Sequence, residues 1–592
     1  MTPHTQPIPL DDGRVLLWRE GVRGGAPEGG GVRKGAPEGG RARGGAPEQS
    51  SGVWCEIILL DRVDEDGSAG TVREQVAGAV PADGLVGLRL LAGPGPDLPA
   101  VVIAIDRRGH STIWGVATDQ PRLGRLAEIP GLLFGGVWLD REGRFLGVDR
   151  AEGDGPAKSV AVDLRDGSWS PLLTVSRASN DRLLACDPRS GLLVVSTDAP
   201  GEERLGWAKL GADTPVCFPE ALHRPGHTTL PLTFDPHGQR VLLQLDEGAR
   251  SSLAVYTPDA DHLAPVQIPA GCIPGAACWT GDLIRFPFSA PAQPPGVATV
   301  RLPGASGWSV AGNAPTEGAR WADAHLEQLD GAAGPIEAIV YGGQGWQTSR
   351  HVLLALHGGP VDAWRFAFDP LLQRLAAAGI VVVALNQRGS SGYGAAHTLA
   401  IRGAWGGPDL DDVCAIARGL DAQRRALDVP ELMLLGTSYG AFLALLAAGC
   451  QPGLWSRCVA LAPFLSGPRL HQESPSAQGL IEQLGGLETL HDDIGPRDVL
   501  RLCHAFQAEL LIVHGGRDER IPVAQSRALR QRLLDLGRRE GTDFTYLEVP
   551  DAGHELAVGT HTPMLYEQVV RFLTGRASHD TGAATARAPA TP

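Results

Sequence analysis

The distribution of apolar residues changes along this chain near residue 325. Before that point, residues 51–320 contain short apolar runs separated by turns, with almost no helical periodicity. Four of these turns carry an aspartate, at positions 106, 140, 187 and 235. Strand pairs joined by Asp, Gly and Pro turns at roughly 40–50-residue spacing are typical of β-propeller blades. The pattern therefore predicts an all-β, propeller-like domain over 51–320, with about six or seven blades; a pair of β-sandwiches is the alternative.

Beyond residue 325, continuous apolar runs alternate with stretches of helical periodicity. The strand-like runs include 351–358, 431–436 and 508–515, and residues 563–576 form a closing amphipathic pattern. Short strands that are apolar on both faces and alternate with helices indicate a mostly parallel sheet covered on both sides. We therefore predict a doubly wound α/β domain over 325–576.

The remaining segments cannot form a packed core. Residues 21–50 repeat a decapeptide three times, as GVRGGAPEGG, GVRKGAPEGG and RARGGAPEQS. Ten residues rich in Gly and Pro are too few for a solenoid unit, so we predict a flexible, disordered insertion of mixed charge. The tail 577–592 is expected to be disordered for the same reason. Residues 1–20 form a separate N-terminal segment without the basic and apolar regions of a secretory signal.

Composition narrows the classes of partner. A chain of 592 residues with 43% hydrophobic and 20% charged residues is typical of soluble globular proteins with more than one domain. The formal net charge is −15, and Lys and Arg gather on no single predicted element. This balance argues against nucleic acid or an anionic membrane surface as a partner.

The cysteine and histidine pattern bears on compartment and cofactors. The nine cysteines are scattered, and no apolar stretch approaches the roughly 18 residues needed to cross a bilayer. Buried free thiols in a reducing cytoplasm are the expected arrangement. Because His and Cys never cluster at ligand spacing, we expect no metal and no organic cofactor.

The stretch LLGTSYGAFLAL, residues 434–445, contains the pattern G-x-S-x-G around Ser438. In a chain with 78 glycines this pattern alone decides little, because chance produces it in about every second shuffled sequence of this composition. Its context is more informative. A predicted strand precedes it and a predicted helix follows, as a nucleophile elbow requires. The alternative is a small residue at an ordinary strand–helix turn.

Two further polar residues follow predicted strands. Asp518 comes just after the run AELLIVHG, and His554 just after FTYLEV. Since ligands gather at the carboxyl ends of strands in such a sheet, we expect these residues to meet Ser438. The chain order Ser, Asp, His is that of α/β-hydrolases. His554 would act as the base and Asp518 would orient it; Glu519 and His561 are the competing acid and base.

A serine hydrolase also needs donors for the oxyanion. The amide of Tyr439, at the start of the predicted helix, is one candidate. The second is expected from the loop LALHGGP, where we predict the Gly359 amide, with Gly358 as the alternative. Arg520, two residues past Asp518, could bind a substrate carbonyl or carboxylate, or could form an ion pair within its loop.

Six blocks, in order across some 200 residues, carry a family resemblance: HGGP (357–360), NQRGSSGYG (386–394), AWGGPDLDD (404–412), GTSYGAF (436–442), HGGRDERIPVAQS (514–526) and DAGHE (551–555). Together they resemble the catalytic domain of the prolyl oligopeptidase family, in particular its acylaminoacyl-peptidase and dipeptidyl-peptidase branches. The resemblance implies an α/β-hydrolase domain preceded by a β-propeller that restricts access to short peptides. It also implies that backbone amides of the HGGP loop contribute to the oxyanion hole.

The chain departs from the family pattern at a few places. Thr437 and Ala441 stand where the family usually has glycine, and Thr437 borders the elbow. A paired-glutamate motif for gripping a free N-terminus is not recognisable, which disfavours the dipeptidyl-peptidase branch. Among the other motif residues we expect structural roles, with His357 ordering the oxyanion loop, Arg388 and Asp411 or Asp412 holding loops in place, and His504 and His514 serving the fold.

The sequence thus predicts a cytoplasmic serine peptidase or amidase that cleaves short peptides through an acyl-enzyme. A carboxylic ester hydrolase, or an acyl-transfer enzyme acting on an acylated small molecule in a biosynthetic pathway, is the alternative within the same chemistry. A propeller-based interaction protein with an idle hydrolase domain is the alternative from another class. The preference for the residue before the scissile bond, the choice between exo- and endopeptidase, and the oligomeric state stay open.

Overall fold

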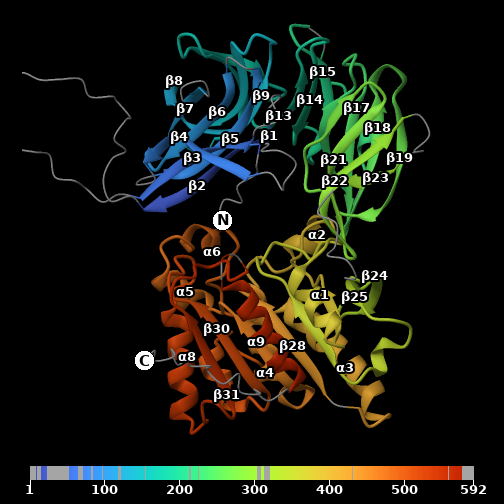
Figure 1. The fold of residues 1–592 in the computed structure, drawn as a ribbon, viewed down its shortest axis with the longest axis vertical. Helices are drawn as coiled ribbons and strands as arrows, with labels where there is room; N and C mark the ends of the chain where they lie inside the picture. The colour runs from blue at the N-terminus through green and yellow to red at the C-terminus, as the bar shows by residue number, and fades with distance from the viewer. Residues whose placement is uncertain are drawn as a thin grey trace, which may run out of the picture. The chain divides into compact units, whose positions relative to one another are not determined.

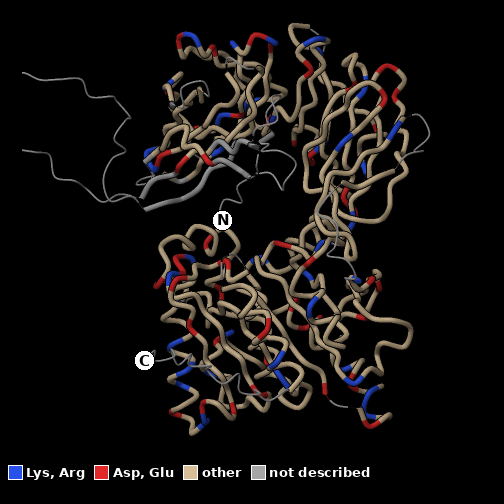
Figure 2. The backbone as a smooth tube through the Cα atoms, viewed as in Figure 1, with Lys and Arg blue, Asp and Glu red and all other residues tan. Residues whose placement is uncertain are grey.

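The computed structural model describes residues 8–9, 15–22, 53–63, 71–81, 85–95, 98–117, 122–153, 155–212, 215–224, 226–302, 308–311, 320–429, 431–557, 559 and 561–575. Most of the decapeptide repeats and the predicted disordered tail lie outside these residues. The chain divides into two compact units: Met1–His223 with Leu230–Leu242 and Val255–Ala264, and Arg224–Thr229 with Leu243–Ala254 and Pro265–Pro592. Figure 1 shows the ribbon, and Figure 2 shows acidic and basic residues interspersed along the chain rather than gathered in one block.

The strands before residue 312 form antiparallel sheets in series (Figure 1). Four sheets have four strands each: β1 (Ile8–Pro9), β2 (Val15–Val22), β3 (Val53–Val63) and β4 (Thr71–Pro81); β5 (Leu85–Gly95), β6 (Leu98–Asp106), β7 (His110–Ala117) and β8 (Arg122–Pro130); β16 (Thr228–Phe234), β17 (Val241–Glu247), β18 (Arg250–Thr257) and β19 (His262–Gly271); and β20 (Cys278–Thr280), β21 (Leu283–Ala290), β22 (Gln293–Arg301) and β23 (Ser309–Ala311).

A fifth sheet combines two such units. It contains β9 (Leu132–Trp138), β10 (Phe145–Ala151), β11 (Lys158–Asp163), β12 (Trp169–Leu173), β13 (Asp181–Asp187), β14 (Leu192–Thr197) and β15 (Arg204–Lys209). One parallel pairing, Lys158 with Asp181, joins β9–β12 to β13–β15. The described strands therefore form six antiparallel units, the repeat expected of propeller blades.

The turn aspartates noted in the sequence bind the backbone of their own hairpins. Asp106 Oδ1 accepts hydrogen bonds from the amides of Arg108 and His110, at 2.8 and 2.9 Å. Asp140 and Asp235 accept amides of their turns in the same way. An Asp side chain that replaces a backbone acceptor stabilises a tight turn, which explains why the residue recurs there.

The first sheet begins upstream of the expected domain boundary at residue 51. Strand β2 pairs with β3 along its whole length, from Val15 opposite Leu60 to Val22 opposite Val53. Residues 23–52, which hold most of the decapeptide repeats, connect these two strands. This pairing could not be predicted from the sequence pattern, because the low-complexity segment separates the two strands of one hairpin by 30 residues.

The second half of the chain forms one eight-stranded sheet, in the order β24-β25-β27-β26-β28-β29-β30-β31. The strands are β24 (His325–Asp330), β25 (Pro335–Tyr341), β26 (Val352–Leu356), β27 (Val381–Leu385), β28 (Leu432–Thr437), β29 (Trp455–Leu461), β30 (Glu509–Gly515) and β31 (Phe544–Val549). β24 and β25 run antiparallel to their neighbours, and β27 to β31 pair in parallel.

Helices occupy the connections between these strands. They are α1 (Pro370–Ala377), α2 (Ala395–Leu399), α3 (Pro408–Arg425), α4 (Tyr439–Cys450), α5 (Gly467–Glu473), α6 (Gln478–Gln483), α7 (Val499–Leu502), α8 (Ala524–Asp535) and α9 (Thr562–Thr574). Short 3-10 turns lie at Glu220–Leu222, Pro258–Ala260, Trp346–Thr348, Pro452–Leu454 and Cys503–Ala505. Within the residues described here, every helix falls short of the length and apolar character needed to cross a membrane.

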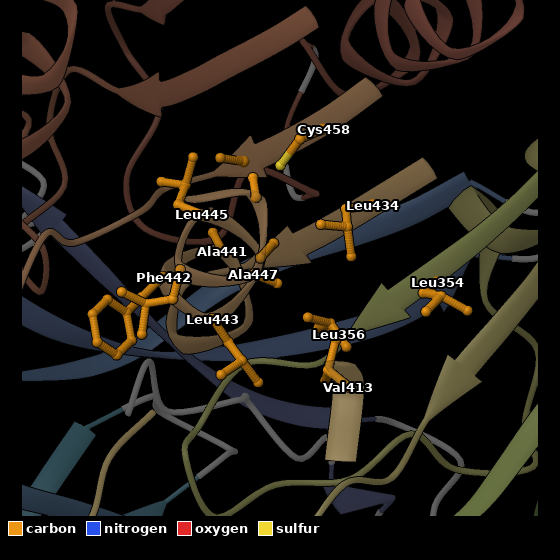
Figure 3. Close-up of a cluster of buried hydrophobic side chains, with 14 of the residues drawn as sticks. Leu354, Leu356, Val413, Leu434, Ala441, Phe442, Leu443, Leu445, Ala447 and Cys458 are labelled. Carbon is orange, nitrogen blue, oxygen red and sulfur yellow. The ribbon is translucent and has the colours of Figure 1, made fainter. Parts of the chain in front are cut away.

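Both faces of the sheet are buried, because alternate residues of each strand point to opposite sides. Leu354, Leu356 and Leu434 pack on one side with α3, α4 and α8. Their neighbours Leu353 and Leu435 pack on the other side with α1 and α9. Figure 3 shows the first of these clusters, with side chains of α4 gathered against the strands. The continuous apolar runs of the sequence follow from this double burial.

Candidate active site

Ser438 lies at the sharp turn between β28 and α4. It has a φ of 57° and a ψ of −117°, a left-handed conformation that is unfavourable for a residue with a side chain. Its amide donates to the carbonyl of Leu461 at the end of β29, at 2.8 Å. The Ser438 carbonyl accepts the amides of Ala441 and Phe442, which begins the helix. These contacts hold the strained turn of a nucleophile elbow.

The two glycines of the elbow are required by close backbone contacts. A Cβ atom at Gly440 would lie 2.3 Å from the carbonyl oxygen of Leu356 and 2.4 Å from that of His357. A Cβ at Gly436 would lie 2.1 Å from the carbonyl oxygen of Gly440. Because each of these neighbours is backbone, α4 can start against β26 and β28 only if both positions lack a side chain.

His554 and Asp518 meet Ser438 at the carboxyl ends of the strands. Asp518 follows β30, and His554 lies in the loop after β31. His554 Nε2 is 3.1 Å from Ser438 Oγ, and His554 Nδ1 is 2.7 Å from Asp518 Oδ2. The side chain of Asp518 is fully buried, and that of His554 is 10% exposed. Since the carboxylate can only accept, Nδ1–H donates to it and leaves Nε2 to accept the Ser438 hydroxyl proton.

Several donors surround the Asp518 carboxylate. Burial alone would raise its pKa, but hydrogen bonds from His514 and His554 and the amide of Ile521 bring the pKa well below its usual range. The amides of Arg520 and Ile521 donate to Oδ1 at 2.9 and 2.8 Å. Asp518 is thus an ionised carboxylate that faces the ring of His554.

The competing acid and base candidates, Glu519 and His561, do not contact Ser438. Glu519 is exposed to solvent. His561 Nε2 lies 3.1 Å from the carbonyl of Leu556. His514 contacts Ser526, the carbonyl of Ile521 and Asp518 Oδ2, and His504 contacts the carbonyl of Arg501. That both histidines serve the fold stays a prediction.

The oxyanion candidates lie on either side of Ser438. Tyr439 is the first residue of α4, and neither its amide nor that of Gly359 has a protein acceptor among the described residues. Gly358 lies against the serine, since a Cβ there would be 3.5 Å from Ser438 Cβ. The geometry therefore places the HGGP loop beside Ser438, and the choice between the Gly359 and Gly358 amides for the oxyanion hole stays a prediction.

His357 is hydrogen-bonded to this loop. Its Nδ1 is 2.7 Å from the carbonyl of Gly358, and its Nε2 is 2.7 Å from Ser390 Oγ. Burial lowers the pKa of His357, which favours the neutral ring. The neutral ring then donates from Nδ1 to the Gly358 carbonyl, and its Nε2 faces Ser390 Oγ and the side-chain amide of Gln387, an arrangement that suits a loop-ordering role. The Ser390 contact was not predictable from the HGGP motif alone.

The two arginines singled out in the sequence have different surroundings. Arg388 forms a two-point ion pair with Asp412, with Nε at 2.8 Å from Oδ2 and Nη2 at 2.9 Å from Oδ1. Arg520 has Nη1 3.5 Å from Glu555 Oε1, and its buried Nη2 has no hydrogen-bond partner among the described atoms. Burial also lowers the pKa of Arg520. Sequence reasoning missed Glu555, although it directly follows His554.

Residues 366–579 match the family model of the prolyl oligopeptidase family. The α/β domain is therefore similar to members of this family. Curated proteins similar to this chain include an uncharacterised peptidase of Bacillus subtilis, 29% identical over 36% of this chain and 32% of the relative. A dipeptidyl-peptidase 5 of Aspergillus fumigatus is 24% identical over 38% of this chain and 31% of the relative. The chain thus matches about a third of the length of these curated relatives.

Solved structures extend the likeness over both halves of the chain. A puromycin-hydrolyzing peptidase of Mycobacterium tuberculosis aligns with a TM-score of 0.64 and 18% identity, over 88% of this chain and 83% of its own. The acylaminoacyl peptidase of Pyrococcus horikoshii aligns with a TM-score of 0.65 and 14% identity, over 98% and 89% of the two chains. This likeness confirms the predicted fold class, an α/β-hydrolase domain preceded by a β-propeller.

The elbow geometry predicts the effect of adding one methyl group. Gly440→Ala places a Cβ on the carbonyls of Leu356 and His357, so the turn must shift. We expect a loss of about 1–3 kcal/mol in stability and at least a ~100-fold slower reaction of Ser438 with a fluorophosphonate probe. Gly419→Ala on α3 is the matched control, because nothing lies within 4 Å of its added Cβ; it should label normally and gain about 0.5–1 kcal/mol. Labelling of Gly440→Ala at the wild-type rate would contradict the steric argument.

The buried carboxylate predicts a second result. Asp518→Asn keeps the shape of the side chain but removes the charge that orients His554, so kcat should fall by about 10⁴. Because the folded-state pKa of Asp518 is lowered, its contribution to stability is present above the ordinary carboxyl pKa of about 3.9 and is lost as pH falls below it. The difference in melting temperature between wild type and variant should therefore shrink below about pH 4. The exposed Asp551→Asn is the control and should show neither effect.

Proposed function

We propose that this chain is a serine peptidase or amidase that cleaves short peptides through an acyl-enzyme. The continuous contact from Ser438 Oγ through His554 to Asp518, at 3.1 and 2.7 Å on a strained elbow, carries the proposal. The match of residues 366–579 to the prolyl oligopeptidase family supports it. In this proposal Ser438 is the nucleophile, His554 the general base and Asp518 the residue that orients the imidazole.

The reaction follows from these positions. His554 Nε2 takes the Ser438 proton as Oγ attacks the carbonyl carbon of the substrate, and Asp518 stabilises the imidazolium. The oxyanion receives hydrogen bonds from the amides of Tyr439 and Gly359, or of Gly358 in its place. His554 then protonates the leaving amine, and the C–N bond breaks to leave an ester on Ser438. Water, deprotonated by His554, attacks this ester and releases the acid.

Short peptides are the proposed substrates, and no nucleic acid or membrane partner is proposed. The similar solved structures are a puromycin-hydrolyzing peptidase and an acylaminoacyl peptidase. Both names support cleavage of a bond next to an amino-acid or acylated residue. A cytoplasmic location is proposed because the eight cysteines whose side chains the structure describes are free thiols, as expected in a reducing compartment.

The nucleophile is tested with wild type and Ser438→Ala, using Ser309→Ala as the control because that serine lies exposed on β23. We expect a fluorophosphonate probe to label wild type and the control but not Ser438→Ala. The substrate class is tested with an amide and an ester that share one acyl group, and with a peptide library containing acetylated, free-amine and cyclic members. We expect hydrolysis of the amide and of short linear peptides. Turnover of the ester alone would favour the ester-hydrolase alternative, and labelling without any turnover would favour a binding role.

We also propose that Arg520 binds a carbonyl or carboxylate of the substrate. The unpartnered Nη2 of this arginine supports the proposal, because a buried donor without an acceptor is costly until a ligand supplies one. Arg520→Met keeps the length of the side chain and should raise KM about 10- to 100-fold with a smaller effect on kcat. Arg517→Met, at a position that is 72% exposed, is the control and should leave KM unchanged. An equal rise in KM for Glu555→Gln would instead assign Arg520 a role within its loop.

A further inference from the structure

The side chain of Tyr439 extends from the elbow into a buried polar contact that the proposed mechanism does not use. Tyr439 follows Ser438 directly, and only 1% of its surface is exposed. Its hydroxyl donates to Asp409 Oδ2 at 2.7 Å and accepts the amide of Gly406 at 3.3 Å. Asp409 lies in the first turn of α3, so this contact ties the start of α3 to the start of α4.

Aromatic side chains enclose the Tyr439 ring. Trp405 packs edge-on at 5.3 Å between ring centroids, Phe442 lies at 5.7 Å and Phe464 at 6.1 Å. These neighbours are themselves buried. Inside such a cluster a hydroxyl without partners is costly, and among the described residues its partners are Asp409 and the amide of Gly406. The ring and its hydroxyl therefore have one favourable position, and that position depends on Asp409.

Burial of the Asp409 carboxylate at this position costs folding stability. Its side chain is fully buried and has no cation within ion-pair distance among the described residues, whereas its neighbour Asp412 is paired with Arg388. Besides the Tyr439 hydroxyl, the carboxylate accepts the amide of Leu410 at 3.0 Å. Burial raises the pKa of Asp409 to about 6, although the hydrogen bond from Tyr439 acts in the opposite direction. The ionised form therefore costs stability at neutral pH.

The charged groups around Asp409 come from three elements. On α3 itself lie Asp411 and Asp412. From the loop after β27 comes Arg388, whose pKa is raised mainly by Asp412 and only weakly by Asp409. From the loop before α7 comes Arg497, which donates through Nε to the carbonyl of Gly406 and pairs with Asp492. No described group thus neutralises Asp409 directly.

We propose that Asp409 is a positioning residue for acyl transfer, which through the Tyr439 hydroxyl fixes the backbone amide of Tyr439 beside the oxyanion. This inference rests on the proposed function. It names a residue outside the triad on which the rate of the proposed reaction depends. The amide and the hydroxyl belong to the same residue, so anchoring the far end of the side chain restricts rotation of the backbone at the elbow. Donors to an oxyanion act only when they are held close to the productive geometry.

The test uses Asp409→Asn and Tyr439→Phe, separately and combined, in the full chain. Kinetic constants on a short peptide, fluorophosphonate labelling rates and melting temperatures are measured. Each single variant should lower kcat and the labelling rate about 10- to 100-fold, with KM within about twofold of wild type, because the loss falls on transition-state stabilisation. The double variant should be no slower than the slower single variant, because both changes break one contact. Asp421→Asn is the control, since Asp421 is also buried on α3 but pairs with Arg425; it should keep the wild-type kcat.

Two readouts separate positioning from a purely structural role. At pH 8 the melting temperature of Asp409→Asn should equal or exceed that of wild type, because the neutral amide avoids the cost of a buried charge. The raised pKa of Asp409 means that wild type loses this charge as pH falls through about 6. The ratio of wild-type to Asp409→Asn labelling rates should therefore approach one below that pH, because the wild-type residue is then neutral as well.

Wild-type rates in both single variants, or effects that add in the double variant, would overturn the proposal. If Asp409→Asn loses stability together with activity, Tyr439→Phe decides: retained labelling overturns the proposal, and lost labelling at an unchanged melting temperature supports it. Failure of the proposed substrate class looks different. Wild type would then react with the probe without cleaving peptides, and the labelling rates of the variants would still decide the role of Asp409. A wild type that does not react with the probe at all would remove both proposals.

Discussion

The close approach of three backbone segments at Ser438 is the constraint on which the site depends. Strand β28, the start of α4 and the end of β26 meet so tightly that Gly436 and Gly440 leave no space for a methyl group. This contact forces Ser438 into its left-handed conformation. The strain is supported by the fully buried sheet beneath it, whose strands pack on both faces. Ser438, the amide of Tyr439 and the HGGP loop all take their positions from that single turn.

Much of this arrangement was predictable because the physical cause is local in the sequence. Uninterrupted apolar runs such as 351–358 and 431–436 reflect strands buried on both sides, and they correspond to β26 and β28. Asp518 and His554 follow β30 and β31, and parallel strands bring their carboxyl ends to one edge. The order of the chain and the rule for such sheets were therefore enough to name the three residues that the structure brings together.

The parts that escaped prediction depend on contacts between distant segments. The pairing of β2 with β3 spans the decapeptide repeats, so no local pattern marks it. The hydrogen bonds of His357 with Ser390 and of Tyr439 with Asp409 join residues 33 and 30 positions apart in the sequence. The spacing of residues along the sequence does not indicate which buried polar groups contact one another in the folded domain. The sequence likewise does not indicate whether the amide of Gly358 or that of Gly359 faces the oxyanion, because this depends on the conformation of the loop.

Helix α4 is apolar on every side, and its residues from Tyr439 to Gly449 are all buried. A helix with no solvent-exposed face cannot unfold locally without exposing core side chains. Its amide hydrogens therefore exchange with solvent only when the surrounding sheet opens. Tyr439, which follows Ser438, is therefore carried by one of the most protected segments of the domain. Loss of the reactive geometry on heating and loss of the domain's fold should then be a single cooperative event.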